Sequence, residues 1–135
     1  MKSGINIWAV IVSGVGTTAF GFLWFTMWFV KPYIEGLDKT KAQLDRGPSG
    51  PTAITYQVIG NIVMVFVLAW LMQITDNSSV GQGIKLAAIL WLGFVAAVIG
   101  PTYAFQAFPF SFFLIVTGYT LVALIMSAVV LGLWK

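Results

Sequence analysis

The chain has 135 residues, of which 59% are hydrophobic and only 8% are charged. An average soluble domain carries about 25% charged residues, so a soluble fold this poor in charge could not cover its surface. The net charge of +3 comes from seven basic and four acidic residues, which lie in loops and at the ends and favour membrane anchoring over nucleic-acid binding. The absence of Cys and His excludes disulfides, thiol chemistry, the usual zinc sites and His ligation of haem.

Long uncharged stretches predict four membrane-spanning helices. About 20 apolar residues, each rising 1.5 Å, cross a hydrocarbon layer of roughly 30 Å. We expect an all-α integral membrane protein, with four transmembrane helices in an antiparallel bundle that forms a single transmembrane domain over residues 1–135. The predicted spans are about 5–30, 53–74, 84–104 and 112–134.

The first predicted span, residues 5–30, is too long for a signal peptide, whose apolar core has about 7–15 residues. We therefore expect an uncleaved helix. Ser13, Thr17 and Gly21 recur at every fourth position, and small residues at this spacing let two helix backbones approach closely. The alternative is that small residues are simply common in membrane helices.

Most of the charge lies between the first two spans. Lys31-Pro32 is predicted to end the first helix, because proline lacks the amide donor and restricts the residue before it. Thr40 to Gln43 fits a capping box, in which a hydroxyl and an amide satisfy free backbone donors. These features predict a short amphipathic interfacial segment with one or two turns of helix, followed by a connecting turn at residues 47–51.

Asn61 lies near the middle of the second span. A carboxamide at membrane depth needs a partner, so we expect it to face the bundle and to bond a neighbouring helix, with a gain of about 1 kcal/mol. Contact with a ligand is the alternative role.

Small residues also recur in the last two spans. Gly93 and Ala97 lie four positions apart in the third span, as do Ala128 and Gly132 in the fourth. Gly100-Pro101 is predicted to kink or end the third helix. The following uncharged and aromatic residues, 102–110, suit a segment at the membrane interface.

Aromatic and basic residues mark the ends of the predicted spans. Four spans place both termini on one side of the membrane. The expected interface anchors are Trp8, Trp28, Trp70, Lys85, Trp134 and Lys135. By four basic residues to three, the positive-inside rule places the long loop after the first span in the cytoplasm and both termini outside.

The sequence carries no recognisable reaction centre. Proton-coupled transporters usually keep an ionisable residue inside the membrane, and none occurs in residues 5–30, 53–74, 86–100 or 112–134. Small multidrug exporters have a similar length and span number, but their essential glutamate has no counterpart in residues 5–30. Neither a carboxylate pair nor a phosphate-binding loop is present, so we predict no enzyme, no catalytic residue, no metal site and no dedicated cofactor, although bound lipids or another lipophile would fit.

Several apolar motifs resemble one known family in their order and spacing. They are Phe20-Gly21-Phe22-Leu23-Trp24-Phe25, Trp91-Leu92-Gly93-Phe94-Val95-Ala96, the pair Gly118-Tyr119 and the ending Leu131-Gly132-Leu133-Trp134-Lys135. Across essentially the whole chain the sequence resembles the bacterial membrane family called domain of unknown function 1761. The resemblance implies a four-span protein of the bacterial inner membrane and no particular activity. In relatives a His follows the Gly-Tyr pair, and Thr120 stands there in this chain.

Two functional hypotheses follow. The first is a non-catalytic accessory or structural subunit that packs, among membrane lipids, against a larger membrane protein complex or against itself. Its helix-packing candidates are Ser13, Thr17, Gly21, Trp24, Asn61, Gly93, Ala97 and Gly132. The alternative is a small homo-oligomer that binds or transports a lipophilic molecule, such as a lipid, quinone or pigment. Its contact candidates are Tyr103, Phe105, Phe108 and Tyr119.

Overall fold

The computed structural model describes residues 5–134, and every regular element within this range is helical. Four segments are long and apolar enough to cross a membrane: Ile7–Trp28, Gly50–Ile74, Val80–Phe105 and Phe110–Leu133. We call them spans one to four. The predicted all-α class with four membrane-spanning helices is therefore confirmed.

Two of the spans contain a π-helical segment. Span one consists of α1 (Ile7–Leu23) followed by the π-helical η1 (Trp24–Trp28). Span three consists of α5 (Val80–Trp91), the π-helical η2 (Leu92–Ala96) and α6 (Ala97–Phe105). Spans two and four are the single helices α4 (Gly50–Ile74) and α7 (Phe110–Leu133).

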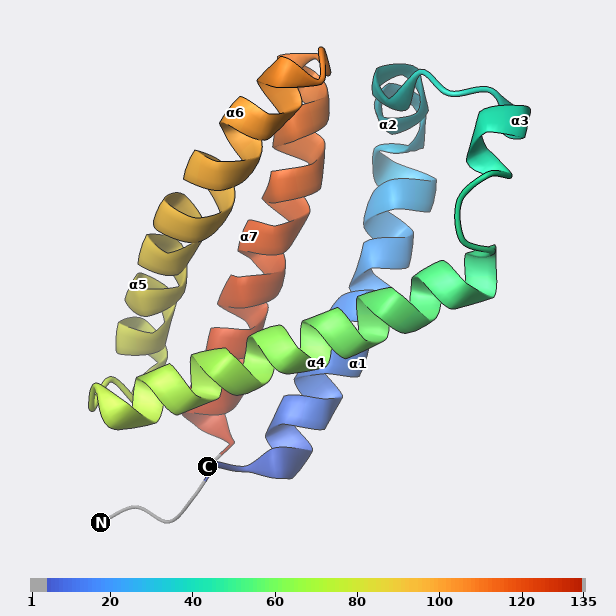
Figure 1. Ribbon diagram of the computed structural model, residues 1–135. Coiled ribbons are helices and arrows are strands. Elements are labelled where there is room, and N and C mark those ends of the chain that lie inside the picture. Colours follow the sequence, from blue (N-terminus) through green and yellow to red (C-terminus); the bar gives the residue numbers. More distant parts are fainter. Residues whose placement is uncertain (1–4, 135) are drawn as a thin grey trace.

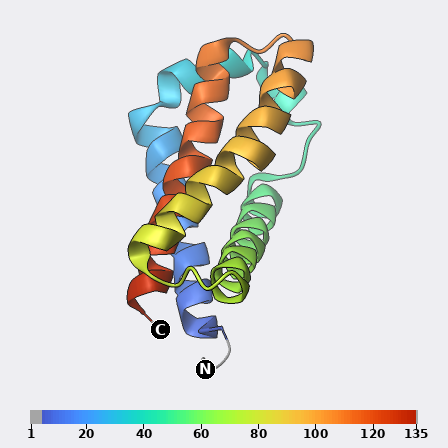
Figure 2. The same ribbon diagram turned by 90° about the vertical axis from the view of Figure 1, so that its left-hand side faces the viewer.

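Span four is the centre of the bundle. Span one packs against α7 on one side and span three on the other, while α4 crosses obliquely over α1 and the lower part of α7 (Figure 1). In the view turned by 90°, α4 is seen more nearly along its axis, which shows how far it departs from the direction of the other spans (Figure 2).

The two ends of the described chain lie together, as four antiparallel spans require (Figure 1). The side-chain amide of Asn6 caps α1 by accepting from the Ala9 amide, and its Nδ2 donates to the Trp134 carbonyl at 3.2 Å. The connection between spans one and two and the turn between spans three and four lie at the opposite end (Figure 1).

The connection between spans one and two contains two short helices, α2 (Val30–Leu37) and α3 (Lys41–Leu44). The predicted capping box is present, because the Gln43 amide donates to Thr40 Oγ1 and the Thr40 amide donates to Gln43 Oε1. The predicted short helical turns are therefore confirmed, and the position of this segment at the membrane interface stays a prediction.

The prediction that Lys31-Pro32 ends the first helix is wrong. The backbone breaks earlier, at Phe29, whose φ of −125° and ψ of 23° are not helical. Pro32 lies in the first turn of α2, where backbone amides have no partner inside the helix and proline costs little.

Two other prolines are also accommodated in helices. Pro51 occupies the first turn of α4, which Ser49 caps by accepting from the Thr52 amide, so residues 50 and 51 are helical and not part of the predicted turn. Pro101 lies inside α6, and the helix continues to Phe105 before it ends.

Candidate functional site

A polar junction joins three spans near the middle of each. It consists of Thr17 and Thr18 in α1, Asn61 in α4 and Tyr119 in α7, and all four residues are buried. The small residues of α1 bring the helices close enough for these contacts, since a methyl group at Gly14 would lie 2.5 Å from Ile62 Cγ1 of α4. Residues far apart in the sequence therefore share one site at membrane depth.

The hydrogen bonds of the polar junction use both hydrogens of the Asn61 amide. Asn61 Nδ2 donates to Thr18 Oγ1 at 2.9 Å and to the Tyr119 hydroxyl oxygen at 3.1 Å. Tyr119 in turn donates its hydroxyl hydrogen to the Thr17 carbonyl at 2.7 Å. Unpaired polar groups in hydrocarbon cost several kcal/mol, so a closed set of bonds lets these side chains remain buried.

Gln57 extends the polar junction toward the outside of the bundle. It lies one turn before Asn61 on α4 and is exposed, and its Nε2 donates to Asn61 Oδ1 at 2.9 Å. This bond gives the buried Asn61 oxygen a donor and fixes the orientation of its amide.

Glycines and aromatic rings of α1 and α7 pack reciprocally beside the polar junction. A methyl group at Gly21 would lie 3.1 Å from the Tyr119 ring, and one at Gly118 would lie 3.4 Å from the Trp24 ring. Each span thus supplies one glycine and one aromatic residue to the same contact.

Two tryptophans of neighbouring spans donate hydrogen bonds to the backbone of α7. Trp24 Nε1 donates to the Ile115 carbonyl at 2.9 Å, and Trp91 Nε1 donates to the Thr117 carbonyl at 2.8 Å. Trp24 begins η1, and Trp91 directly precedes η2. Each of these tryptophans therefore lies where a π-helical segment begins, and such single π-helical turns inside α-helices are rare.

A column of aromatic rings leads from the polar junction to the end of the bundle that carries α2. Phe25 lies between Tyr119 and Tyr33, with ring centroids 5.4 Å and 4.9 Å away. Tyr33 stacks on Phe112 at 5.4 Å, and Phe112 stacks on Phe108 at 4.6 Å. Burial raises the pKa of Tyr33 above its usual value of 10.0. Offset and edge-on rings such as these add specific contact energy to their buried area.

The predicted helix-packing residues fall into two groups. Ser13, Thr17, Gly21 and Asn61 are buried, Trp24 is half-buried, and Gly132 meets span three, where an added methyl group would lie 2.7 Å from Val80 Cγ2. Gly93 and Ala97 are instead exposed on the outside of the bundle. Small-residue spacing does not distinguish an inner face from an outer one.

The four predicted lipophile contacts lie in different surroundings. Phe105 is 94% exposed, while the Tyr119 hydroxyl is used within the polar junction. Tyr103 and Phe108 pack on each other, with centroids 5.1 Å apart. They belong to the aromatic column.

The predicted anchors that the structure describes lie near the ends of the spans. Trp8, Trp28, Trp70 and Trp134 are all more than two-fifths exposed, and the Lys85 side chain is exposed as well. Lys135 lies outside the described residues.

Sequence reasoning missed Thr18, Trp91 and Gly118. Thr18 is adjacent to Thr17, but the four-residue spacing of small residues in span one includes Thr17 and not Thr18. Trp91 and Gly118 lie in motifs that the family resemblance singles out, although neither motif shows that its residue contacts another span. Within residues 5–134 there is no cluster of three or more Asp, Glu, His or Cys residues that could hold a metal ion.

Comparison with known proteins gives one match. We found no matching curated protein and no matching solved structure. The profile of a family described as "Protein of unknown function (DUF1761)" matches residues 8–132, which include all the contacts of the polar junction. The chain therefore belongs to the family of proteins of unknown function called DUF1761.

Proposed function

We propose that this membrane protein is a non-catalytic subunit that packs, through the outer surface of span three, against another integral membrane protein. The observation that carries the proposal is Gly93. It is exposed in the middle of span three, and within residues 5–134 a methyl group there would meet nothing within 4 Å beyond its own stretch of helix.

A glycine on the exposed face of a helix lowers the stability of the chain that contains it. Glycine in a helix is less favourable than alanine by about 1 kcal/mol, and no side chain or backbone of another span in residues 5–134 would obstruct a methyl group at Gly93. Ala97 lies four residues further on and is also exposed. Two small residues at this spacing let a helix from another chain approach closely.

Span three is also the least buried of the four spans. In its most apolar window 11% of the residues are buried, compared with 33%, 28% and 39% in spans one, two and four. Phe94 beside Gly93 is 74% exposed. In the other three spans, Thr18, Asn61 and Tyr119 bond one another in the polar junction. Such bonds suit a rigid bundle whose role is to present an apolar surface.

The test is the size of the protein extracted from its native membrane in mild detergent, on a native gel followed by mass spectrometry of the band. We compare the wild type with Gly93→Leu and with the matched control Gly60→Leu. Gly60 is also exposed and without neighbours within 4 Å, but bulky Tyr56 and Met64 stand four residues on either side.

We expect the wild type and Gly60→Leu to run in one larger assembly with defined partners, and Gly93→Leu to run as the free protein. A wild-type protein that runs alone contradicts the proposal, as do two variants with the same mobility. If the lone protein retains a stoichiometric lipophilic molecule after extensive washing, it is a lipophile-binding protein.

We also propose that the protein lies in a bacterial inner membrane with the α2–α3 connection in the cytoplasm and both termini outside. Lys31, Lys39, Lys41 and Arg46 support this orientation. Because the chain has no Cys, Lys39→Cys and Ser78→Cys give single labelling sites. An impermeant thiol reagent added outside should label only Ser78→Cys, and the reverse pattern would invert the orientation.

A further inference from the structure

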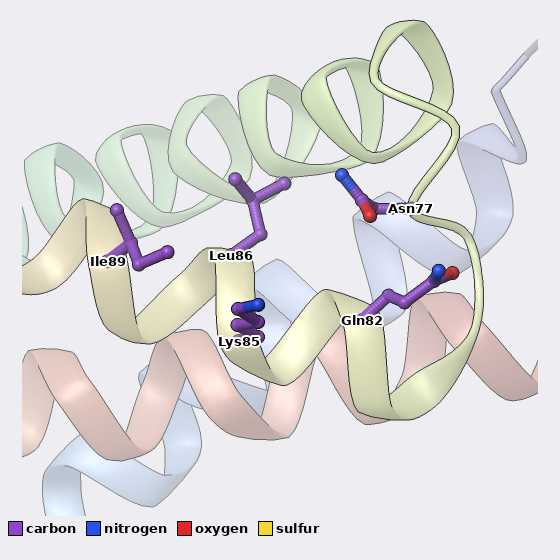
Figure 3. A pocket seen from close by; sticks show the side chains of 5 residues that line it. All are labelled: Asn77, Gln82, Lys85, Leu86 and Ile89. Atoms are coloured by element: carbon purple, nitrogen blue, oxygen red, sulfur yellow. The ribbon is translucent and has the colours of Figure 1, made fainter.

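A small pocket lies at the turn between α4 and α5. Its volume is about 140 Å³, and it is lined by Asn77, Gln82, Lys85, Leu86 and Ile89. Figure 3 shows Asn77 and Gln82 near the turn, with Leu86 and Ile89 on the side of α5 toward α4. The lining is therefore polar at the turn and apolar farther along α5.

The position of the pocket corresponds to the membrane boundary. The apolar helix α4 ends at Ile74, and α5 begins at Val80 after a polar turn. Trp70, which is 48% exposed, lies one turn before the end of α4. Exposed tryptophan at the end of a span marks the level of the lipid headgroups.

The polar part of the pocket offers hydrogen-bond donors. Gln82 Oε1 accepts from Ser79 Oγ at 3.0 Å, and within residues 5–134 both Nε2 hydrogens remain available to another acceptor. Lys85 is exposed and makes no ion pair with any residue in 5–134. The carboxylate of the turn, Asp76, is not part of the lining. A cationic donor beside an amide donor matches the oxygens of a phosphate group.

The apolar part continues from Lys85 toward the membrane interior. Leu86 is half-buried, and Ile89, one turn beyond Lys85, is 57% exposed. An acyl chain that begins at the phosphate level would lie along these two side chains. A free phosphate ion would leave them uncovered.

We propose that this pocket binds one anionic phospholipid, with its phosphate at Lys85 and Gln82 and an acyl chain along Leu86 and Ile89. An anionic lipid fits better than a zwitterionic one, because the headgroup cation of the latter would meet Lys85 without any acidic residue in the lining. Asn77 supplies an amide for headgroup hydroxyls. The site does not depend on whether span three binds another protein.

Native mass spectrometry of the full chain in detergent tests the site. The protein is titrated with phosphatidylglycerol or with phosphatidylcholine of the same acyl chains, and Lys85→Gln is compared with Lys39→Gln. The control removes the same charge from the connection between α2 and α3, which lies at the opposite end of the bundle (Figure 1), and Lys39 is exposed as well. Thermal unfolding shows whether each variant keeps its fold.

We expect one phosphatidylglycerol to bind more tightly than phosphatidylcholine, and Lys85→Gln to weaken it about fivefold, since one Lys near an anionic lipid surface has an effect of this size. Lys39→Gln should bind as the wild type does, and millimolar inorganic phosphate should not displace the lipid. Equal binding of the two lipids overturns the proposal. The proposal is also overturned if Lys85→Gln binds phosphatidylglycerol as tightly as the wild type does, or if Lys39→Gln loses as much affinity as Lys85→Gln. Displacement of the lipid by inorganic phosphate overturns it as well.

Discussion

The Nδ2 atom of Asn61 lies 3.1 Å from the hydroxyl oxygen of Tyr119, across an interface between α4 and α7 near the middle of both spans. The same Nδ2 bonds Thr18 of α1, so one carboxamide connects three helices. Spans two and four make few other contacts with each other, whereas each packs extensively on span one. Asn61 therefore fixes the position of the oblique α4 relative to the centre of the bundle.

Removal of the Asn61 amide should loosen α4. We expect Asn61→Leu to lower the free energy of unfolding by about 1–3 kcal/mol, because Tyr119 and Gln57 both lose a partner. Tyr119→Phe keeps the ring against Gly21 and should cost less, about 0.6–1.7 kcal/mol.

Unfolding in mixed micelles with a graded denaturing detergent measures both variants and their double mutant. The two losses should be non-additive, because the residues share a hydrogen bond. Additive losses would show that the Asn61–Tyr119 bond does not contribute to stability. If Asn61→Leu keeps the stability of the wild type but loses a co-purified lipophilic molecule, Asn61 is instead a ligand contact.

Gly132 and Gly93 should respond in opposite directions to the same substitution. In Gly132→Ala the new methyl group would lie 2.7 Å from Val80 Cγ2 and 2.8 Å from Val80 Cα, so the helices must separate. Overpacking of this kind costs about 1–3 kcal/mol. Gly93→Ala meets no neighbour and should stabilise the isolated fold by up to about 1 kcal/mol. The midpoints of thermal unfolding in detergent measure the difference, and equal shifts would contradict the packing of α7 on α5.

The two tryptophan bonds to α7 should each contribute to stability. Trp24→Phe and Trp91→Phe keep an aromatic ring but lose the donor to the Ile115 or Thr117 carbonyl, and we expect each to cost about 1 kcal/mol or somewhat more. Trp8→Phe is the control, since Trp8 is 69% exposed. Unfolding midpoints of the three variants provide the comparison. A control that loses as much stability as the other two would refute a specific role for the indole bonds.

Replacement of Ala107 by glycine should stabilise the folded protein. It follows α6 with a φ of 63°, in the left-handed region, and its amide donates to the Ala104 carbonyl while Phe108 donates to Tyr103. This is the Schellman arrangement, whose left-handed position favours glycine because it has no Cβ.

Ala107→Gly is therefore expected to raise the free energy of unfolding by about 1 kcal/mol. The control Ala88→Gly, at an exposed position inside α5, should lower it by a similar amount. Thermal unfolding of both variants checks the signs, and a loss of stability in Ala107→Gly would mean that the turn is not left-handed in the folded protein.

Much of the architecture is determined by local sequence. Residues 112–134 contain enough apolar side chains to cross a bilayer, and Thr40 with Gln43 forms its capping box, because both properties depend on residues within a few positions. The helix termini are less predictable. Pro32 and Pro51 fall in first turns, and the effect of a proline depends on where the helix begins.

The tertiary structure alone decides which small and polar residues meet. Gly132 and Gly93 look alike in the sequence, yet one faces Val80 and the other faces outward. The sequence predicts that Asn61 needs a partner at membrane depth, but Thr18 and Tyr119 lie 43 and 58 residues away. Hydrophobicity determines that a helix enters the membrane, whereas its rotation and neighbours depend on close packing and hydrogen bonds between helices, because lipid and apolar side chains solvate a helix equally well.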